Sequence, residues 1–177
     1  MTHVRLLLIT FLILCCASVR LDACWAEPPE VRVQSTLDGE LFLRVLKSKK
    51  TVEVRRAKDL QLLWKMRIVD FDPLFSEFRA TPDGKFLVHI KGNNMVTSAN
   101  QSCVDVYGRS GFRDSYRVNE IRKSLPKYRP KLRFSTDPDY VWHEEVKEPT
   151  DETLVIRLDE KRYAWLSLGT HKVEIHQ

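Results

Sequence analysis

Apolar residues recur at every second position along most of the chain, and this period limits the possible folds more than any other feature. A β-strand turns successive side chains to opposite faces, whereas an amphipathic helix needs apolar spacings of three and four residues. The alternating segments are residues 41–45, 52–54, 60–68, 86–90, 104–106, 154–158 and 173–175. In the longest segment, one apolar face is expected to hold Leu60, Leu62, Trp64, Met66 and Ile68. The pattern predicts a mostly β protein.

Turn residues separate the alternating segments. Asp38-Gly39 and Asp83-Gly84 are tight-turn pairs, and glycine adopts the positive φ that such turns require. Short strands with turn signals about every 8–12 residues indicate antiparallel sheets. One short helix is expected near 119–125, with Asn119 as its amino-terminal cap and Pro126 after its end.

The strands fall into three groups of about 40 residues each, which is the size of one propeller blade: 31–69, 75–118 and 140–176. In the second group, residues 78–88 run Phe-Arg-Ala-Thr-Pro-Asp-Gly-Lys-Phe-Leu-Val, and residues 104–111 run Val-Asp-Val-Tyr-Gly-Arg-Ser-Gly. This block resembles a blade of bacterial β-propeller-like repeat proteins, and it is similar to uncharacterised exported bacterial proteins that carry it once. The resemblance implies a packing unit without catalytic residues.

Three blades cannot close a propeller, because a closed ring needs at least about four. The expected fold class is therefore mostly β, with antiparallel blade-like sheets in a partial propeller-like or sandwich arrangement and one short helix near 119–125. Exposed strand edges would be blunted by charge, as Lys47, Lys49 and Lys50 suggest, or paired with a second chain. Self-association through strand edges is one contact that this arrangement predicts.

The first 26 residues are typical of an export signal. Arg5 precedes an unbroken apolar run from Leu6 to Ala17, and small residues lie near Ala26. The run is shorter than the about 20 residues that a membrane-spanning helix needs. Cleavage after Ala26 would leave residues 27–177 as a single β-rich domain, secreted or held in the periplasm.

Two other processing routes stay open. The sequence Leu-Asp-Ala-Cys at residues 21–24 is similar to a degenerate lipobox. In that case Cys24 would carry a lipid and anchor the protein to the cell envelope. Cleavage near Ala17 would also release a soluble product. Only Cys103 remains after cleavage at Ala26, so no disulfide can form within the chain, and we expect this thiol to be buried and unreactive.

The sequence carries no catalytic signature. It has no Gly-x-Ser-x-Gly elbow, no phosphate-binding Gly-rich loop and no His-Glu-x-x-His helix. His143-Glu144-Glu145 lies in an expected strand, so no metal and no cofactor are predicted. Two acidic pairs could supply the acid and base of a hydrolase: Asp70 with Asp72, and Asp137 with Asp139. Each pair abuts a proline, where aspartate is a common turn residue.

The alternation also predicts where single side chains lie. His89 is opposite Val88 and Ile90 on its strand, so we expect it on the wetter face of the sheet. The tryptophans beyond residue 60 are expected in the core: Trp64, Trp142 and Trp165.

One segment is distinguished by its charge. Residues 122–133 hold no acidic residue and six basic ones, which are Arg122, Lys123, Lys127, Arg129, Lys131 and Arg133. Outside the cytosol, such a segment would attract an anionic glycan, a wall polymer or a lipid headgroup. The net charge of the whole chain is only +5, and an exported protein rarely meets nucleic acid, so none is expected as a partner.

Two classes of function follow from these observations. The first is an exported, non-catalytic binding or assembly module built of blade-like sheets, with a basic loop that contacts anionic polymers. The alternative is a secreted hydrolase that uses a paired-carboxylate site. The missing catalytic motifs favour the module.

Overall fold

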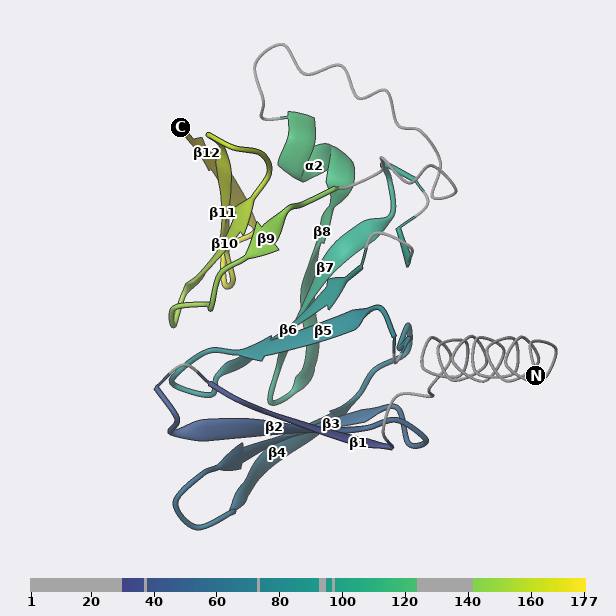
Figure 1. Ribbon diagram of the computed structural model, residues 1–177, viewed down its shortest axis with the longest axis vertical. Helices are drawn as coiled ribbons and strands as arrows, with labels where there is room; N and C mark the ends of the chain where they lie inside the picture. The colour runs from purple at the N-terminus through teal and green to yellow at the C-terminus, as the bar shows by residue number, and fades with distance from the viewer. Residues whose placement is uncertain (1–29, 37, 73, 93–94, 97, 124–141) are drawn as a thin grey trace, which may run out of the picture.

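Three antiparallel sheets make up the described part of the chain, each with four strands. The computed structural model describes residues 30–36, 38–72, 74–92, 95–96, 98–123 and 142–177. Each sheet is a meander formed by one continuous stretch of sequence, and Figure 1 shows the sheets following one another in chain order. The predicted fold class, mostly β with antiparallel sheets and one short helix, is confirmed.

The strands are short, as the sequence pattern indicates. Sheet A contains β1 (Val31–Ser35), β2 (Leu41–Leu46), β3 (Thr51–Arg56) and β4 (Leu62–Arg67). Sheet B contains β5 (Ser76–Ala80), β6 (Phe86–Lys91), β7 (Ser102–Gly108) and β8 (Gly111–Arg117), and β8 runs directly into α2 (Val118–Lys123). Sheet C contains β9 (Glu145–Val146), β10 (Thr153–Arg157), β11 (Tyr163–Ser167) and β12 (Lys172–His176).

Sheet B is the middle layer and is covered on both faces. One hydrophobic core joins sheets A and B and includes Leu43 and Leu87. The other core joins sheets B and C and includes Val88 and Leu166. Successive side chains of β6 therefore enter different cores. This explains why nearly every residue of β6 and β7 is buried.

This layering corrects the predicted position of His89. Its side chain does lie opposite Val88, as the alternation predicts, but its exposed fraction is 0 %. An antiparallel sheet with one covered face leaves the other face in water. Sheet B has no such face, because sheet A covers the side to which His89 points.

A β-bulge changes which side chains of β4 reach the core. The register between β3 and β4 shifts between Val54 and Arg55, and an extra residue in one strand reverses the faces beyond it. Leu63 consequently packs against the core between sheets A and B, while Leu62 is 40 % and Leu60 is 63 % exposed. The prediction of one continuous apolar face over residues 60–68 is therefore wrong for Leu60 and Leu62.

The predicted helix forms but begins earlier than expected. α2 covers Val118–Lys123, so Asn119 lies inside it instead of capping it. The side chain of Glu120 accepts the N–H of Arg117 over 2.7 Å, which is the backward hydrogen bond of a capping box. Ile121 is buried in the core between sheets B and C. Among the described residues, no helix has the length and apolar character to span a membrane.

Candidate binding surfaces

The turn that joins β1 to β2 is closed by one threonine. The Oγ1 of Thr36 donates a hydrogen bond to Oδ1 of Asp38 over 2.6 Å and accepts the N–H of Leu41 over 3.1 Å. Gly39 follows with a φ of 72°, a conformation that glycine adopts without steric cost. The hydrogen bonds from Thr36 and from the N–H of Glu40 hold the pKa of the Asp38 carboxyl below its ordinary value.

The turn that joins β5 to β6 repeats this arrangement. The Oγ1 of Thr81 donates to Oδ1 of Asp83 over 2.7 Å and accepts the N–H of Phe86 over 3.1 Å. Gly84 follows with a φ of 66°. Sheets A and B therefore share one turn design at the same place, and the sequence signal for it is a threonine two residues before each Asp-Gly pair.

These two turns meet the β9–β10 turn of sheet C around a pocket of about 430 Å³. In the sheet C turn, the Oγ1 of Thr150 also accepts a backbone N–H, that of Thr153, over 3.1 Å. All three sheets contribute to the pocket, whose polar lining consists of Thr36, Asp38, Glu148, Thr150 and Asp151.

The carboxylates of this pocket already have partners within the protein. Asp151 accepts the N–H of Asp83 over 3.1 Å, and Oε1 of Glu148 lies 3.3 Å from Nε of Arg79. Both contacts attach the sheet C turn to sheet B. The pocket is therefore a joint among three sheets, with carboxylates that act as structural acceptors.

A buried ion pair lies on the face of sheet B that is turned toward sheet A. Nζ of Lys91 lies 3.0 Å from Oδ2 of Asp105 and donates to Oγ of Ser102 over 2.7 Å. Lys91 is 2 % exposed and Asp105 is 6 % exposed. Asp70 also approaches this ammonium, at 3.3 Å, but its side chain is 68 % exposed. The fold encloses the pair almost completely.

His89 lies beside this pair and is neutral. Its Nε2 is 2.9 Å from Oγ of Ser76, and its ring stacks on Phe78 with 4.7 Å between the ring centres. Burial, and then the charge of Lys91, lower the pKa of His89 to about 3. The 3.8 Å distance between His89 and Asp105 is therefore not an ion pair. Among the described residues, Nδ1 of His89 has no hydrogen-bond partner.

The predicted acidic pair of Asp70 and Asp72 has structural roles. Asp70 faces Lys91, while Oδ1 of Asp72 accepts the N–H of Leu74 over 2.8 Å and so closes the turn before β5. No three His, Cys, Asp or Glu side chains gather at a metal-binding distance in the described part of the chain. The second acidic pair lies outside the described residues: Asp137 and Asp139.

The basic segment is described only at its beginning. Arg122 and Lys123 form the last residues of α2. The pKa of His143 is lowered to about 4, chiefly by burial and further by the charge of Arg122. Four basic residues and the proposed lipidation site lie outside the described residues: Lys127, Arg129, Lys131, Arg133 and Cys24. Their roles therefore stay predictions.

Three of the aromatic and thiol side chains that the sequence assigns to the core are found there. Cys103 is buried in β7, and its Sγ lies 3.3 Å from the carbonyl oxygen of Tyr116. Burial raises the pKa of this thiol, so the thiolate is disfavoured. Trp64 and Trp142 are also buried, and the indole N–H of Trp142 donates to the carbonyl of Lys91 over 2.9 Å.

The outer face of sheet A contributes no side chain to either hydrophobic core of the described residues. A row of side chains crosses this face from β1 to β4: Val33, Arg44, Glu53 and Lys65. Val33 is 63 % exposed. Glu53 lies between two guanidinium groups, 2.8 Å from Arg55 and 3.7 Å from Arg44. The face is therefore basic, with an apolar margin along β1.

Sheet C also leaves its outer face open in the described part of the chain. Val155, Trp165 and Glu174 form a row across β10, β11 and β12. The predicted core position of Trp165 is wrong, because its side chain lies on this face and is 44 % exposed. Beside it, Nζ of Lys147 lies 4.8 Å from the ring centre of Tyr163. Alternation alone could not show which face of this strand would be covered.

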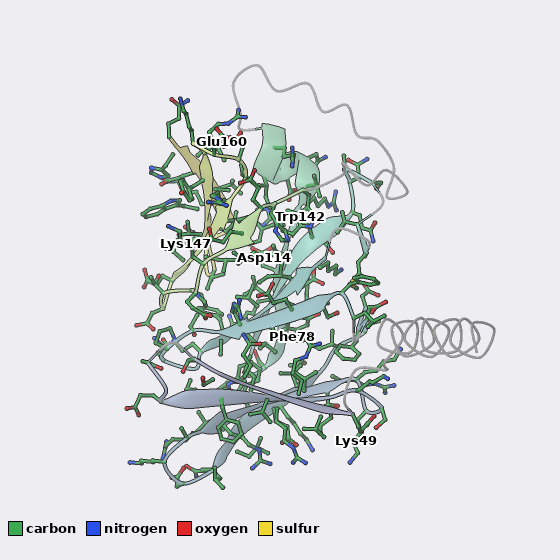
Figure 2. All side chains as sticks on the ribbon, in the orientation of Figure 1. Lys49, Phe78, Asp114, Trp142, Lys147 and Glu160 are labelled. Carbon is green, nitrogen blue, oxygen red and sulfur yellow. The ribbon has the colours of Figure 1, made fainter. Side chains whose placement is uncertain are left out.

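The two end sheets differ in charge. Residues 30–67, which include sheet A, hold ten basic and five acidic residues, whereas residues 142–177, which include sheet C, hold five basic and eight acidic residues. Lys49 is exposed in the β2–β3 turn, and Glu160 is exposed in the β10–β11 turn. Glu160 borders a hollow of about 880 Å³ that three acidic residues and two basic ones line: Glu144, Asp159, Glu160, Lys161 and Arg162. Figure 2 shows Lys49 and Glu160 at opposite ends of the molecule.

The chain matches no family model and no curated protein. Among solved structures it is similar to Kluyveromyces lactis Hsv2, with a TM-score of 0.44 and 16 % identity over 86 % of this chain and 48 % of that one. It is also similar to the β-propeller domain of Myceliophteria thermophila Cps50 (Swd1), with a TM-score of 0.40 and 11 % identity over 81 % of this chain and 41 % of that one. The chain thus spans less than half the length of these structures. Similarity at this level does not indicate what the chain binds.

Proposed function

We propose that the protein is a non-catalytic binding and assembly module. The observation that carries this proposal is the pair of open faces at the two ends of the layered sheets, on sheet A and sheet C. Within the described residues, three of the buried titratable side chains are held in structural contacts: Lys91 with Asp105, and His89 with Ser76. Exposed apolar side chains lie on both faces: Val31 and Val33 on sheet A, and Trp165 on sheet C.

The proposal includes contact with anionic polymers outside the cytosol. It is supported by the charge of residues 122–133 and by the signal-like character of residues 1–26. An array of basic side chains attracts a polyanion through long-range charge, and salt screens this attraction. An anionic glycan, a wall polymer or a lipid headgroup would each provide the required charge.

Removing the positive charge of this segment is expected to weaken retention on an anionic matrix. The change is Lys127, Arg129, Lys131 and Arg133 together to glutamine. At about 0.15 M salt we expect the apparent affinity for the matrix to be about tenfold lower than that of the wild-type protein. Salt at this concentration screens charges that lie more than about 8 Å from the matrix, so basic residues elsewhere on the protein do not compensate for the lost ones. The measurement is elution from a heparin column along a salt gradient. A control with the same loss of charge replaces four exposed residues elsewhere: Lys58, Arg109, Lys161 and Lys172. Equal loss of retention in the control would contradict a role specific to the segment.

Export is expected to leave a new amino terminus. The signal-like segment predicts cleavage after Ala26, so that the mature chain begins at Glu27. Mass spectrometry of the protein purified from a bacterial host with intact export would detect this terminus. A lipid-modified Cys24 would instead show anchoring to the envelope, and an intact Met1 on all of the protein would contradict export.

A further inference from the structure

The outer face of sheet A carries an excess of positive charge among its described residues. The strand registers place one acidic side chain on it, that of Glu53, and four basic ones: Arg44, Arg55, Lys65 and Arg67. Lys49 and Lys50 add two exposed charges in the β2–β3 turn at one end of the sheet. Glu30 offsets one of them, and its carboxylate accepts the N–H of Ser48 in the same turn over 2.9 Å. The face therefore attracts an anionic partner.

Apolar side chains lie on both edge strands of the same face. Each of its three rows of paired residues holds an apolar side chain and a basic one: Val31 with Arg67, Val33 with Lys65, and Leu62 with Arg55. Val69 follows just beyond β4 and is 82 % exposed. The strands β1 and β4 lie about 14 Å apart, because three spacings of about 4.8 Å separate the first and fourth strands of a sheet. A partner that covers all three rows must be broad as well as anionic.

A lipid surface with anionic headgroups meets both requirements. Its negative charge attracts lysine and arginine side chains, and apolar side chains enter the boundary between the headgroups and the acyl chains. A single extended polymer could follow one row of the face, but it would leave the apolar side chains of the other rows in water. The mixture of charged and apolar side chains in every row therefore favours a membrane over a polymer strand.

We propose that the outer face of sheet A docks on an anionic lipid surface. The proposal rests on the proposed binding function and deepens it, because it names one surface of the fold and the chemistry of its partner. The docking surface consists of described residues and is separate from the basic segment 122–133.

The outer face of sheet C does not share this character. The registers place Glu145 and Glu174 beside Arg157 and Lys172 on it, so charges of opposite sign are mixed. Sheet A and sheet C lie at opposite ends of the molecule (Figure 1). A protein docked through sheet A would therefore hold sheet C away from the lipid, and sheet C supplies matched control positions.

The length of chain before β1 also favours sheet A as the docking surface. Six residues separate Cys24 from Val31, and six residues span at most about 22 Å. A lipid on Cys24, which is one of the processing routes left open by the sequence, would thus keep β1 close to the bilayer. β1 carries two of the exposed apolar side chains of the face, Val31 and Val33.

The test is co-sedimentation of the full chain with lipid vesicles of two compositions. One is phosphatidylcholine alone, and the other contains about 30 % phosphatidylglycerol as the anionic lipid. The wild-type protein should bind the anionic vesicles at least about tenfold more tightly, and added salt should reduce this preference because it screens charge. The apolar run of residues 6–17 would bind both kinds of vesicle, so the ratio of the two affinities is the readout.

Two double variants address the charged and the apolar side chains separately. Lys65→Gln with Arg67→Gln should lower the affinity for anionic vesicles about 25-fold, because each basic side chain near such a surface contributes about fivefold. Val33→Ser with Val69→Ser should lower it about tenfold through lost apolar contact. All four side chains are exposed, so both variants should keep the fold, as circular dichroism would confirm.

The matched control is Lys147→Gln with Lys172→Gln, which removes the same charge from exposed positions of sheet C. It should change the affinity less than about twofold, because salt screens charges far from the lipid. Equal losses in the sheet A and sheet C variants, or a wild-type protein without preference for anionic vesicles, would overturn the proposal.

Other partners of the face would give different results. If the sheet A variants lost retention on heparin, or lost self-association in sedimentation velocity, while vesicle binding stayed unchanged, the face would bind a polymer or a second copy and the lipid proposal would be wrong. A protein that ignores vesicles but is retained on heparin through residues 122–133 would refute the lipid surface and leave the proposed binding function in place.

Discussion

Replacing Lys91 by methionine is expected to destabilise the protein by about 3–5 kcal/mol, which is the usual cost of removing one partner from a buried ion pair. The carboxylate of Asp105 would remain enclosed, since the residue is only 6 % exposed. Its nearest opposite charge is the Lys91 ammonium at 3.0 Å. Asp70 cannot take over this role, because it is another carboxylate and lies largely in solvent.

Urea unfolding followed by tryptophan fluorescence would measure this effect. The double variant Lys91→Met with Asp105→Leu should recover most of the lost stability, because two apolar side chains leave no unpaired charge. Lys85→Met is a matched control: it breaks an ion pair with Asp83 in which the lysine side chain is 70 % exposed. That change should cost less than about 1 kcal/mol. If Lys91→Met cost no more than this control, the enclosed pair would have no special role in stability.

Acidification from pH 7 to pH 5 is expected to lower the free energy of unfolding by about 4 kcal/mol. In the folded protein the pKa is about 3 for His89 and about 4 for His143, against about 6.5 in an unfolded chain. The unfolded chain therefore binds two protons in this interval that the folded protein does not, and each histidine contributes about 2 kcal/mol. The loss begins as the pH falls below about 6.5 and is absent above about pH 7.

Comparison of denaturation midpoints at pH 7, 6 and 5 would check this pH dependence. His89→Gln and His143→Gln should each remove about half of the acid effect, because glutamine does not titrate. His176→Gln is the control, since the His176 side chain is 48 % exposed and the change should leave the acid effect intact. An unchanged slope in both buried-site variants would show that other groups control acid stability.

Much of the local structure could be predicted because its signals are local. The alternation identifies seven of the twelve described strands, which are β2, β3, β4, β6, β7, β10 and β12, and the Asp-Gly pairs identify the turns that follow Thr36 and Thr81. The enclosed pair of Lys91 and Asp105 could not be found in the same way. In the sequence, Lys91 ends one apolar strand and Asp105 lies in the middle of another. Only the pairing of β6 with β7 brings the two residues together.

The exposure of the tryptophans could not be predicted from local signals either. Trp165 and Trp64 occupy similar positions in alternating segments, yet one is 44 % exposed and the other 7 %. The difference depends on which sheet face has a neighbour, and no local pattern carries that information. The basic segment, although evident in the sequence, lies mostly outside the described residues, so its role stays a prediction.

By itself, the sequence determined most of the strands, the Asp-Gly turns, the mostly β class and the charge excess of each segment, because these depend on residues close together in the chain. The tertiary structure alone decided that sheet B is covered on both faces, that His89 is enclosed and neutral, and that Trp165 lies on an open face. The physical reason is that alternation assigns a side chain to one of two faces. Whether that face meets water or another sheet depends on contacts between residues distant in sequence.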